Sequence, residues 1–293
     1  MPDRSSAALY WHRNMRRPWW LANLVLLLFT SGVLAAGERL ELKGQLVQGG
    51  MVIGRTMPGA QVRFDGRDVR VADNGEFVIG FGRDAREHML LEIRYPDAQV
   101  SRRRLTVRQR RYPIQRISGL SAQQVTPGKA ELVRIRREAA QIRQARSANS
   151  TRTDFDGTWI WPVSGTITGV YGSQRILNGK PRSPHRGVDI AAPAGTPVRA
   201  PIDGAVSFAE QGLFFSGGTV ILDHGHGIST TYVHLRRILV HTGQAVQKGQ
   251  SLGEVGASGR ATGPNLHWGL NWFDRRLDPS LLVPSMAEMR SKR

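Results

Sequence analysis

Apolar and polar residues alternate in short runs between Gly37 and about Leu120. The alternating apolar pairs are Leu40 and Leu42, Val62 and Phe64, Val69 and Val71, and Phe77 and Ile79. A period of two is typical of β-strands with one buried face, so these runs predict a small β-sandwich over residues 37–120. The segment Asp73-Asn74-Gly75 predicts a hairpin turn between two of the strands, because Asn and Gly tolerate a positive φ. No cluster of ionisable residues accompanies these strands, which favours a binding or spacing module.

The apolar period changes near residue 126. Four apolar residues then follow one another at intervals of three or four, with arginines between them: Leu132, Ile135, Ala139 and Ile142. This spacing predicts a basic amphipathic helix and a polar linker over residues 126–151. Thr126 and Pro127 would supply its N-cap and its first helical residue. We expect the apolar stripe to pack against a folded domain, and contact with an anionic membrane surface is the alternative.

Residues 155–285 contain further short apolar runs, which glycine or proline residues separate. The runs lie near residues 165–171, 188–191, 204–209, 219–223, 229–234 and 266–272. An antiparallel sheet suits them, because parallel pairing requires long crossover helices that the pattern does not contain. The expected fold class is therefore all-β with a linker helix: a β-sandwich-like domain followed by a domain built on an antiparallel sheet.

Two segments beside these strands carry side chains suited to substrate contacts. The segment between Tyr171 and His185 is expected to be a loop, and it contains Arg175 and Arg182, whose charges would attract a carboxylated substrate. Phe215 lies close to Gly217-Gly218 and would line a substrate groove.

The N-terminus has the pattern of an export signal. Three arginines, Arg13, Arg16 and Arg17, precede an uncharged apolar run from Leu21 to Leu34, and small residues follow at Ala35 and Ala36. This order predicts a secretory signal peptide over residues 1–36 and a periplasmic or extracellular location. An uncleaved membrane anchor is the alternative, because the run approaches the roughly 20 apolar residues that a membrane span requires.

The charge of the chain limits the kinds of partner it is expected to bind, and its cysteine content limits its chemistry. The chain has 41 Lys and Arg against 23 Asp and Glu, a net charge of +18, which favours an anionic partner. It has no cysteine, which excludes disulfides and thiolate chemistry. For an exported basic chain, a cell-wall polymer is a more plausible partner than nucleic acid. Contact with a membrane surface, through the N-terminus or the basic helix, is a further expectation.

The candidate chemistry lies between His185 and His267. His185 and Asp189 are four residues apart, so on an extended strand their side chains share a face. With His267 from a distant strand they would form a set of two histidines and one aspartate. Such a set binds a single zinc ion and leaves one position open for water and substrate, as in a hydrolase.

Several motifs in this region resemble a known family. They are His185-Arg186-Gly187-Val188-Asp189, Leu222-Asp223-His224-Gly225, Tyr232-Val233-His234-Leu235 and Gly263-Pro264-Asn265-Leu266-His267. In this order they are similar to the signature of the lysostaphin-type (LytM, M23) zinc metallopeptidases, over about residues 159–280. Residues 37–150 carry no comparable signature.

The resemblance implies a fold, a cofactor and a reaction. It implies a peptidase domain of the LytM or duplicated-hybrid-motif type, with one zinc ion held by His185, Asp189 and His267. His234 matches the family's catalytic histidine, which positions or polarises the attacking water. The implied substrate is peptidoglycan, hydrolysed at peptide cross-links or stems. His224 and His226, which lie among glycines, are expected to have a turn role.

One position departs from the family pattern. The family usually has a histidine that assists catalysis where this chain has Asn265, and asparagine cannot carry a proton at neutral pH. A non-catalytic LytM-type regulator or wall-binding protein is therefore the alternative function, although the three retained metal ligands favour an enzyme. A biotinyl or lipoyl carrier module is a poor third, because Lys248 lacks the flanking residues of an attachment lysine.

Overall fold

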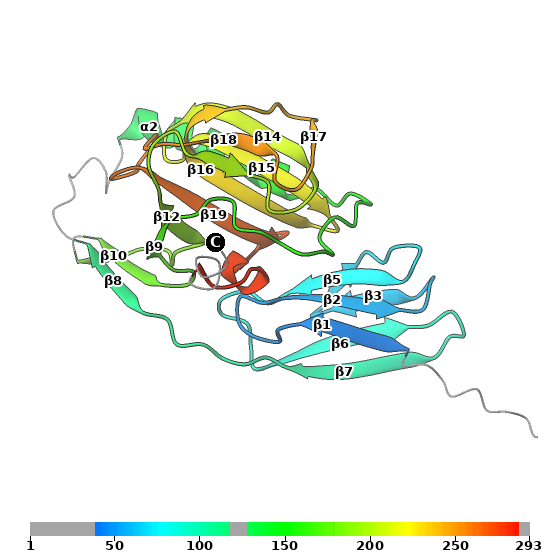
Figure 1. Ribbon diagram of the computed structural model, residues 1–293. Coiled ribbons are helices and arrows are strands. Elements are labelled where there is room, and N and C mark those ends of the chain that lie inside the picture. Colours follow the sequence, from blue (N-terminus) through cyan, green and yellow to red (C-terminus); the bar gives the residue numbers. More distant parts are fainter. Residues whose placement is uncertain (1–38, 118–127, 178, 287–293) are drawn as a thin grey trace, which may run out of the picture. The chain divides into compact units, whose positions relative to one another are not determined.

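The computed structural model describes residues 39–117, 128–177 and 179–286 (Figure 1). The expected signal segment, residues 1–36, and the Thr126-Pro127 pair lie outside these residues. The described part consists mainly of antiparallel β-strands with one α-helix, which confirms the expected fold class. Among the helices described, none combines the length and the apolar character that a membrane crossing requires.

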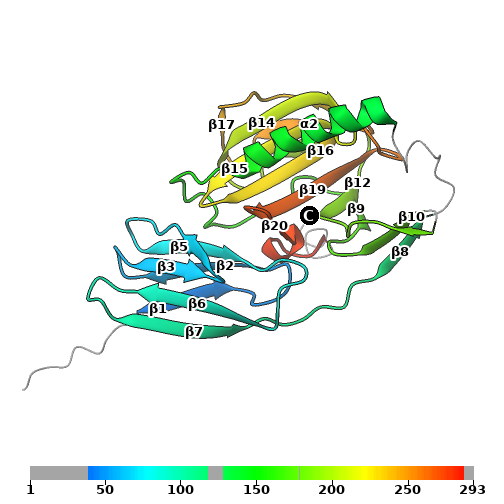
Figure 2. The same cartoon turned by 180° about the vertical axis from the view of Figure 1, so that it is seen from behind.

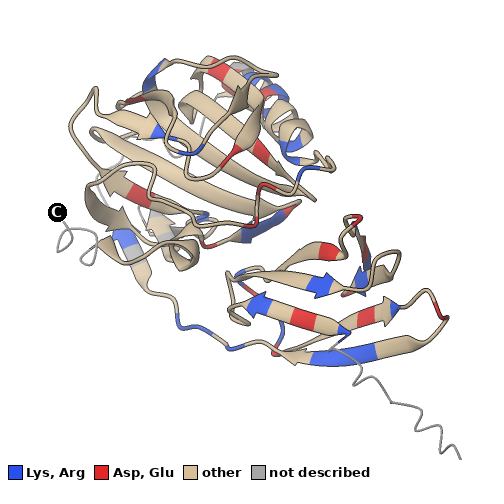
Figure 3. Cartoon of the chain, turned by 45° about the vertical axis from the view of Figure 1, so that its right-hand side comes forward, with Lys and Arg blue, Asp and Glu red and all other residues tan. Residues whose placement is uncertain are grey.

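The first strands form the two sheets of a sandwich. One sheet has the order β1-β2-β5 and the other the order β4-β3-β6-β7. The strands are β1 (Leu40–Gly44), β2 (Met51–Thr56), β3 (Gln61–Phe64), β4 (Arg67–Val69), β5 (Glu76–Gly80), β6 (His88–Arg94) and β7 (Val100–Thr106). Alternate residues of β6 are buried, as a strand with one face on the core requires. Basic residues form a continuous stretch on β7 (Figure 3).

The expected hairpin at Asp73-Asn74-Gly75 is wrong in one respect. The segment is a turn, in which Gly75 has a φ of 84° and the Asn74 side chain accepts a hydrogen bond from the Glu76 N–H at 3.0 Å. However, it joins β4 to β5, and these strands belong to different sheets. Local turn chemistry is the same in both cases, so the sequence could not show which strands pair.

A ten-stranded sheet carries the second half of the chain. Its main path has the order β17-β14-β15-β16-β19-β12-β9, and all its pairings are antiparallel (Figure 1). The strands of this path are β9 (Thr166–Gly169), β12 (Val188–Ala191), β14 (Gly204–Leu213), β15 (Gly217–Gly225), β16 (Ile228–Ile238), β17 (Ala245–Val246) and β19 (Asn265–Trp272). Three further strands join at its side: β13 (Pro197–Arg199), β18 (Ser251–Val255) and β20 (Arg275–Leu277). A 3-10 helix, η1 (Pro279–Leu282), follows.

The expected loop between Tyr171 and His185 contains two short strands. β10 (Gln174–Leu177) and β11 (Lys180–Pro181) form a hairpin, and β10 pairs in parallel with β8 (Ile114–Ile117). The partner strand is about sixty residues earlier in the chain, so no local pattern could reveal the pairing.

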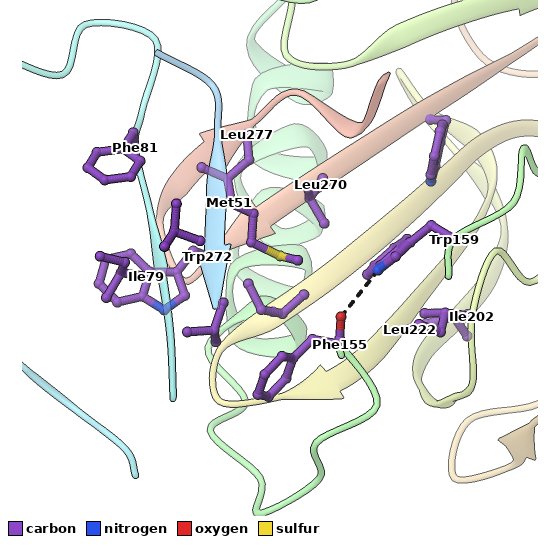
Figure 4. Close-up of a cluster of buried hydrophobic side chains, with 14 of the residues drawn as sticks. Met51, Ile79, Phe81, Phe155, Trp159, Ile202, Leu222, Leu270, Trp272 and Leu277 are labelled. Atoms are coloured by element: carbon purple, nitrogen blue, oxygen red, sulfur yellow. Dashed lines mark hydrogen bonds between the residues drawn. The ribbon is translucent and has the colours of Figure 1, made fainter. Parts of the chain in front are cut away.

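One hydrophobic core extends from the sandwich into the large sheet. Its members include Ile79 on β5, Phe81 directly after β5, and Trp272 and Leu277 on β19 and β20 (Figure 4). The contact is close at Gly80, where an added Cβ would meet the Trp272 Cβ at 2.8 Å. Elsewhere in this core, the Trp159 Nε1 donates to the Phe155 carbonyl at 3.2 Å.

The helix α2 (Lys129–Arg146) lies against β14 and β15 (Figure 2). Its N-cap is Gly128, without a side-chain cap, rather than the expected Thr126. Ile142 and Ala145 pack against the buried side chains Phe208, Leu213 and Ile221. The predicted stripe is therefore only partly correct, because Leu132 is exposed and the acidic Glu138 is buried instead.

Candidate metal centre

The register of two strands brings two of the expected ligands together. Asp189 of β12 lies directly opposite His267 of β19. Directly opposite side chains of an antiparallel pair leave the same face, with Cβ atoms about 5 Å apart. His185 comes from the segment before β12 rather than from the strand itself, which corrects the expectation of a shared strand face. Its backbone N–H donates to the Ser173 carbonyl at 2.9 Å, which fixes its approach to Asp189.

The three side chains converge at their electron-pair donors. Asp189 Oδ1 lies 3.0 Å from His185 Nε2 and 2.7 Å from His267 Nδ1, and the two imidazole nitrogens are 3.0 Å apart. Within the described residues, this is the one group of three or more His, Asp or Glu side chains that could hold a metal ion. Two imidazoles and a carboxylate are a donor set that suits a divalent cation such as zinc.

The hydrogen bond of His185 Nδ1 fixes the tautomer and the orientation of this imidazole ring. His185 Nδ1 lies 3.0 Å from the Val170 carbonyl. A carbonyl oxygen can only accept, so Nδ1 carries the proton and Nε2 of the neutral ring keeps a free electron pair. A backbone carbonyl behind a ligand histidine is the usual device that orients the ring toward a metal.

The pKa shifts of Asp189 and His267 favour a charged carboxylate and a neutral imidazole at neutral pH. Burial raises the pKa of Asp189, but the two adjacent imidazoles outweigh it and hold that pKa well below its usual range. Burial lowers the pKa of His267 to about 4, against the opposing effect of Asp189. The side chain of His185 is 2% exposed, whereas those of Asp189 and His267 are 21% and 20% exposed. The centre is therefore open on one side.

Two glycines that the sequence analysis gave no role make room for these side chains. A Cβ on Gly169 would lie 2.4 Å from Asp189 Oδ2, and a Cβ on Gly187 would lie 2.9 Å from the His267 ring. Both positions therefore exclude larger residues. The position of Gly187 inside the motif, between His185 and Asp189, could have indicated from the sequence that a small residue is needed there. No sequence motif contains Gly169, so there was no such indication for it.

His234 reaches the centre through an irregularity in β16. The register between β15 and β16 pairs Gly218 with Leu235 and Val220 with Tyr232, so two residues of β16 face one of β15. Such a bulge turns a side chain from the face that strict alternation would give it. His234 has a positive φ of 68° at this point, and it lies near enough to contribute to the lowered pKa of His267.

The loop after β18 holds this histidine. His234 Nδ1 lies 2.8 Å from the Ser258 carbonyl, and the His234 N–H donates to the Ser216 carbonyl at 2.8 Å. The Ser258 hydroxyl in turn donates to the Leu235 carbonyl at 2.8 Å and accepts from the Gly218 N–H at 3.0 Å. Ser258 is thus a positioning residue that the sequence analysis missed.

The remaining expected site residues are less closely placed. Asn265 lies two residues before His267 on β19, and its amide donates to the Gly263 carbonyl at 2.8 Å. Phe215 lies in the turn between β14 and β15, under the Arg260 guanidinium at 4.2 Å from the ring centre. Arg182 is exposed after β11. The side chain of Arg175, on β10, lies outside the described part of the structure.

Comparisons with known proteins identify the family of this chain. The family "Peptidase family M23" matches residues 183–279. A crystal structure described as a peptidase M23 from Pseudomonas aeruginosa has 30% identity and a TM-score of 0.62, covering 81% of this chain and 94% of that chain.

Two curated relatives match shorter stretches. A "Lipoprotein NlpD/LppB homolog" of Pseudomonas aeruginosa is 38% identical over 44% of this chain and 40% of its own length. "Peptidoglycan DD-endopeptidase ShyC" of Vibrio cholerae is 45% identical over 29% of this chain and 19% of its own length. The chain thus spans less than half the length of either curated relative.

Proposed function

Since the chain belongs to peptidase family M23, we propose that it is an exported zinc metalloendopeptidase that hydrolyses peptide cross-links or stems of peptidoglycan. The observation that carries the proposal is the convergence of His185, Asp189 and His267, with one side of the group open. The name of the relative ShyC, a peptidoglycan DD-endopeptidase, supports the choice of substrate.

The three convergent residues fit a single zinc ion, which they would hold through His185 Nε2, an Asp189 oxygen and His267 Nδ1. Zinc bound there would polarise the scissile carbonyl and lower the pKa of water to roughly 7. The chain's own contribution is to lower the pKa of His267 by burial and to orient the His185 ring through the hydrogen bond to the Val170 carbonyl.

His234 supplies the proton chemistry in this proposal. The Ser258 carbonyl can only accept, so Nδ1 carries a proton in this contact and Nε2 is the nitrogen that can act as a base. Nε2 would accept a proton from the attacking water and return it to the leaving amine. A general base of this kind typically contributes about 10² to 10⁴ in rate.

Export and domain organisation complete the proposal. We place the signal peptide at residues 1–36, an accessory β-sandwich at 37–120, the helix and linker at 126–151 and the peptidase domain at 155–285. The substrate lies outside the cytoplasm, and a relative named as a lipoprotein supports export. The basic charge of the chain, +18, suits an anionic cell-wall polymer.

The test is digestion of purified peptidoglycan by the mature protein, with the released muropeptides analysed by chromatography. We expect products that disappear with a chelator, return with added zinc, and are missing with His185→Ala. A lack of metal-dependent products, with unchanged binding of the wall polymer by His185→Ala, would refute the peptidase function.

The second candidate is a non-catalytic regulator on the same domain. Asn265 favours it, because this position cannot carry a proton. The same assay separates the two functions, since a regulator would bind the polymer without releasing muropeptides.

A further inference from the structure

A pocket of about 750 Å³ lies between the second half of α2 and the strands β19 and β20. Arginines dominate its lining: Arg67, Arg143, Arg146, Arg186 and Arg276. Its one acidic lining residue, Asp274, already forms an ion pair with Arg67 at 2.8 Å. The pocket therefore presents an excess of positive charge.

Two buried donors in this lining have no partner. Arg146 Nε and Asn271 Nδ2 are inaccessible to solvent and make no hydrogen bond in the described structure. The neighbouring donors are engaged, because Arg146 Nη2 donates to Thr231 Oγ1 at 3.2 Å and Arg276 Nη1 donates to Asn271 Oδ1 at 3.0 Å. Buried polar groups in native proteins are normally paired, so these two donors leave uncompensated positive polarity behind the surface of the pocket.

The charges of the pocket are also unbalanced. In the described part of the chain, no carboxylate forms an ion pair with Arg143, Arg146, Arg186 or Arg276. Burial lowers the pKa of Arg146, and the charges of Arg276 and Arg186 lower it further. Burial and Arg186 lower the pKa of Arg276 to about 10. Three guanidinium groups thus repel one another at a place where an anion would relieve the repulsion.

The pocket lies on the same face of the sheet as the metal centre. Asn271 and His267 are four residues apart on β19, so both side chains leave one face, about 13 Å apart at 3.3 Å per residue. Gly269, between them, presents no side chain. Arg186 directly follows His185. A peptide chain bound at the metal centre can therefore reach the pocket.

We propose that this arginine pocket binds a free carboxylate of a peptidoglycan stem peptide, within about four residues of the bond that is cleaved. The identity of the ligand rests on the proposed function, whereas the preference for a carboxylate rests on the donors and charges of the pocket. Guanidinium groups bind carboxylates through paired, charge-assisted hydrogen bonds, and the exposed Arg143 and Arg186 present such groups to the pocket. Because α2 contributes Arg143 and Arg146, the helix is part of the substrate site.

The test measures binding without turnover. The full chain, with a chelator to stop hydrolysis, is titrated with a soluble stem tetrapeptide and with the same peptide after its carboxylates are converted to carboxamides. The variant Arg143→Gln/Arg186→Gln removes two exposed arginines of the pocket. Its matched control, Arg136→Gln/Arg137→Gln, removes two exposed arginines of α2 that do not line it.

We expect the pocket variant to bind the free-carboxylate peptide at least about ten-fold more weakly, and the control variant to bind it as the parent does. The amidated peptide should bind weakly to all three proteins. Equal binding of the two peptides, or an equal loss in both variants, would overturn the proposal. Inorganic phosphate that binds as tightly as the tetrapeptide would also overturn it, since the pocket would then be a general anion site.

Failure of the pocket and failure of the peptidase function give different results. If binding depends on the carboxylates but no muropeptides are released with metal, the carboxylate pocket is supported and the peptidase function is refuted. If muropeptides are released with metal but neither amidation nor the pocket variant changes peptide binding, the peptidase function is supported and the carboxylate pocket is refuted.

Discussion

Asn265 stands where the family resemblance predicts a histidine. It shares a face of β19 with His267, and its amide already contacts the Gly263 carbonyl. A histidine there would add a second proton carrier beside the metal centre. We therefore expect Asn265→His to raise the rate of muropeptide release by about ten-fold or more, at unchanged metal content, as measured by kcat on a soluble cross-linked muropeptide.

Asn265→Gln is the control for this change, because it keeps an amide and cannot carry a proton. It should not increase the rate. A loss of activity in Asn265→His would contradict the prediction and show that the bond to the Gly263 carbonyl matters more than a second proton carrier.

The buried residue His224 predicts how the stability of the protein depends on pH, and this prediction does not involve a metal ion. The ring is fully buried, with Nδ1 donating to the Asp203 carbonyl at 2.6 Å and Nε2 accepting from the Thr230 hydroxyl at 2.7 Å. Burial lowers the pKa of His224 to about 4, from an ordinary value of 6.5. Between these values the unfolded chain binds a proton that the folded chain does not. The free energy of unfolding therefore falls as the pH falls through this window, by on the order of 3 kcal/mol.

Urea denaturation at several pH values between 7.5 and 4 would measure this fall. His224→Asn, whose amide can still donate to the Asp203 carbonyl, should show a clearly shallower dependence on pH. His226, whose pKa burial also lowers to about 4, leaves a residual slope in the variant. Identical slopes in the two proteins would contradict the assignment to His224.

The ligands and His234 differ in how far the sequence could predict them. Motif spacing predicted that His185, Asp189 and His267 converge, and they do, because two of them lie opposite each other in a regular register. Strict alternation would have put His234 on the same face as the buried Tyr232. Its actual direction depends on the bulge against β15, which is a property of strand pairing and leaves no local trace in the sequence.

At the scale of elements, α2 shows why periodicity alone misplaces a helix face. Glu138 is buried because its Oε2 accepts from the Phe214 N–H at 2.8 Å and its Oε1 accepts from Arg134 Nε at 2.7 Å. The helix is therefore docked by a polar contact near its middle and by Ile142 and Ala145 in its last turns. No apolar pattern can reveal the first contact.

Glu138→Ala should loosen this docking. The change leaves the Phe214 N–H without an acceptor, which costs about 1–3 kcal/mol where the group is buried. We expect faster hydrogen exchange in the backbone amides of α2, measured by mass spectrometry, with little change in the strands of the large sheet. Glu131→Ala removes an exposed acid from the same helix and should leave the exchange nearly unchanged. Equal exchange in both variants would show that Glu138 does not hold the helix.

At the scale of the whole molecule, the sequence predicted two β-rich regions but not the core that joins them. Alternation identifies which face of a strand is buried, and Ile79 and Trp272 both follow it. It does not identify the partner surface. The contact of β5 with β19 and β20 brings together residues almost two hundred positions apart, through a fit that depends on the missing side chain of Gly80.

Gly80 therefore offers a test of whether residues 38–293 unfold as one unit. A Cβ at this position would lie 2.8 Å from the Trp272 Cβ and 2.9 Å from Leu277 Cδ1, so Gly80→Ala forces the two surfaces apart. Overpacking of this kind costs about 1–3 kcal/mol. Gly82→Ala is the matched control, because a Cβ there meets nothing within 4 Å and the φ of Gly82 is not positive. In calorimetry we expect Gly80→Ala to lower the Tm of a single transition and Gly82→Ala to leave it in place. If Gly80→Ala instead splits the trace, and the metal-dependent activity survives the first step, the core contact is dispensable for the catalytic sheet, and the sandwich is a separable domain.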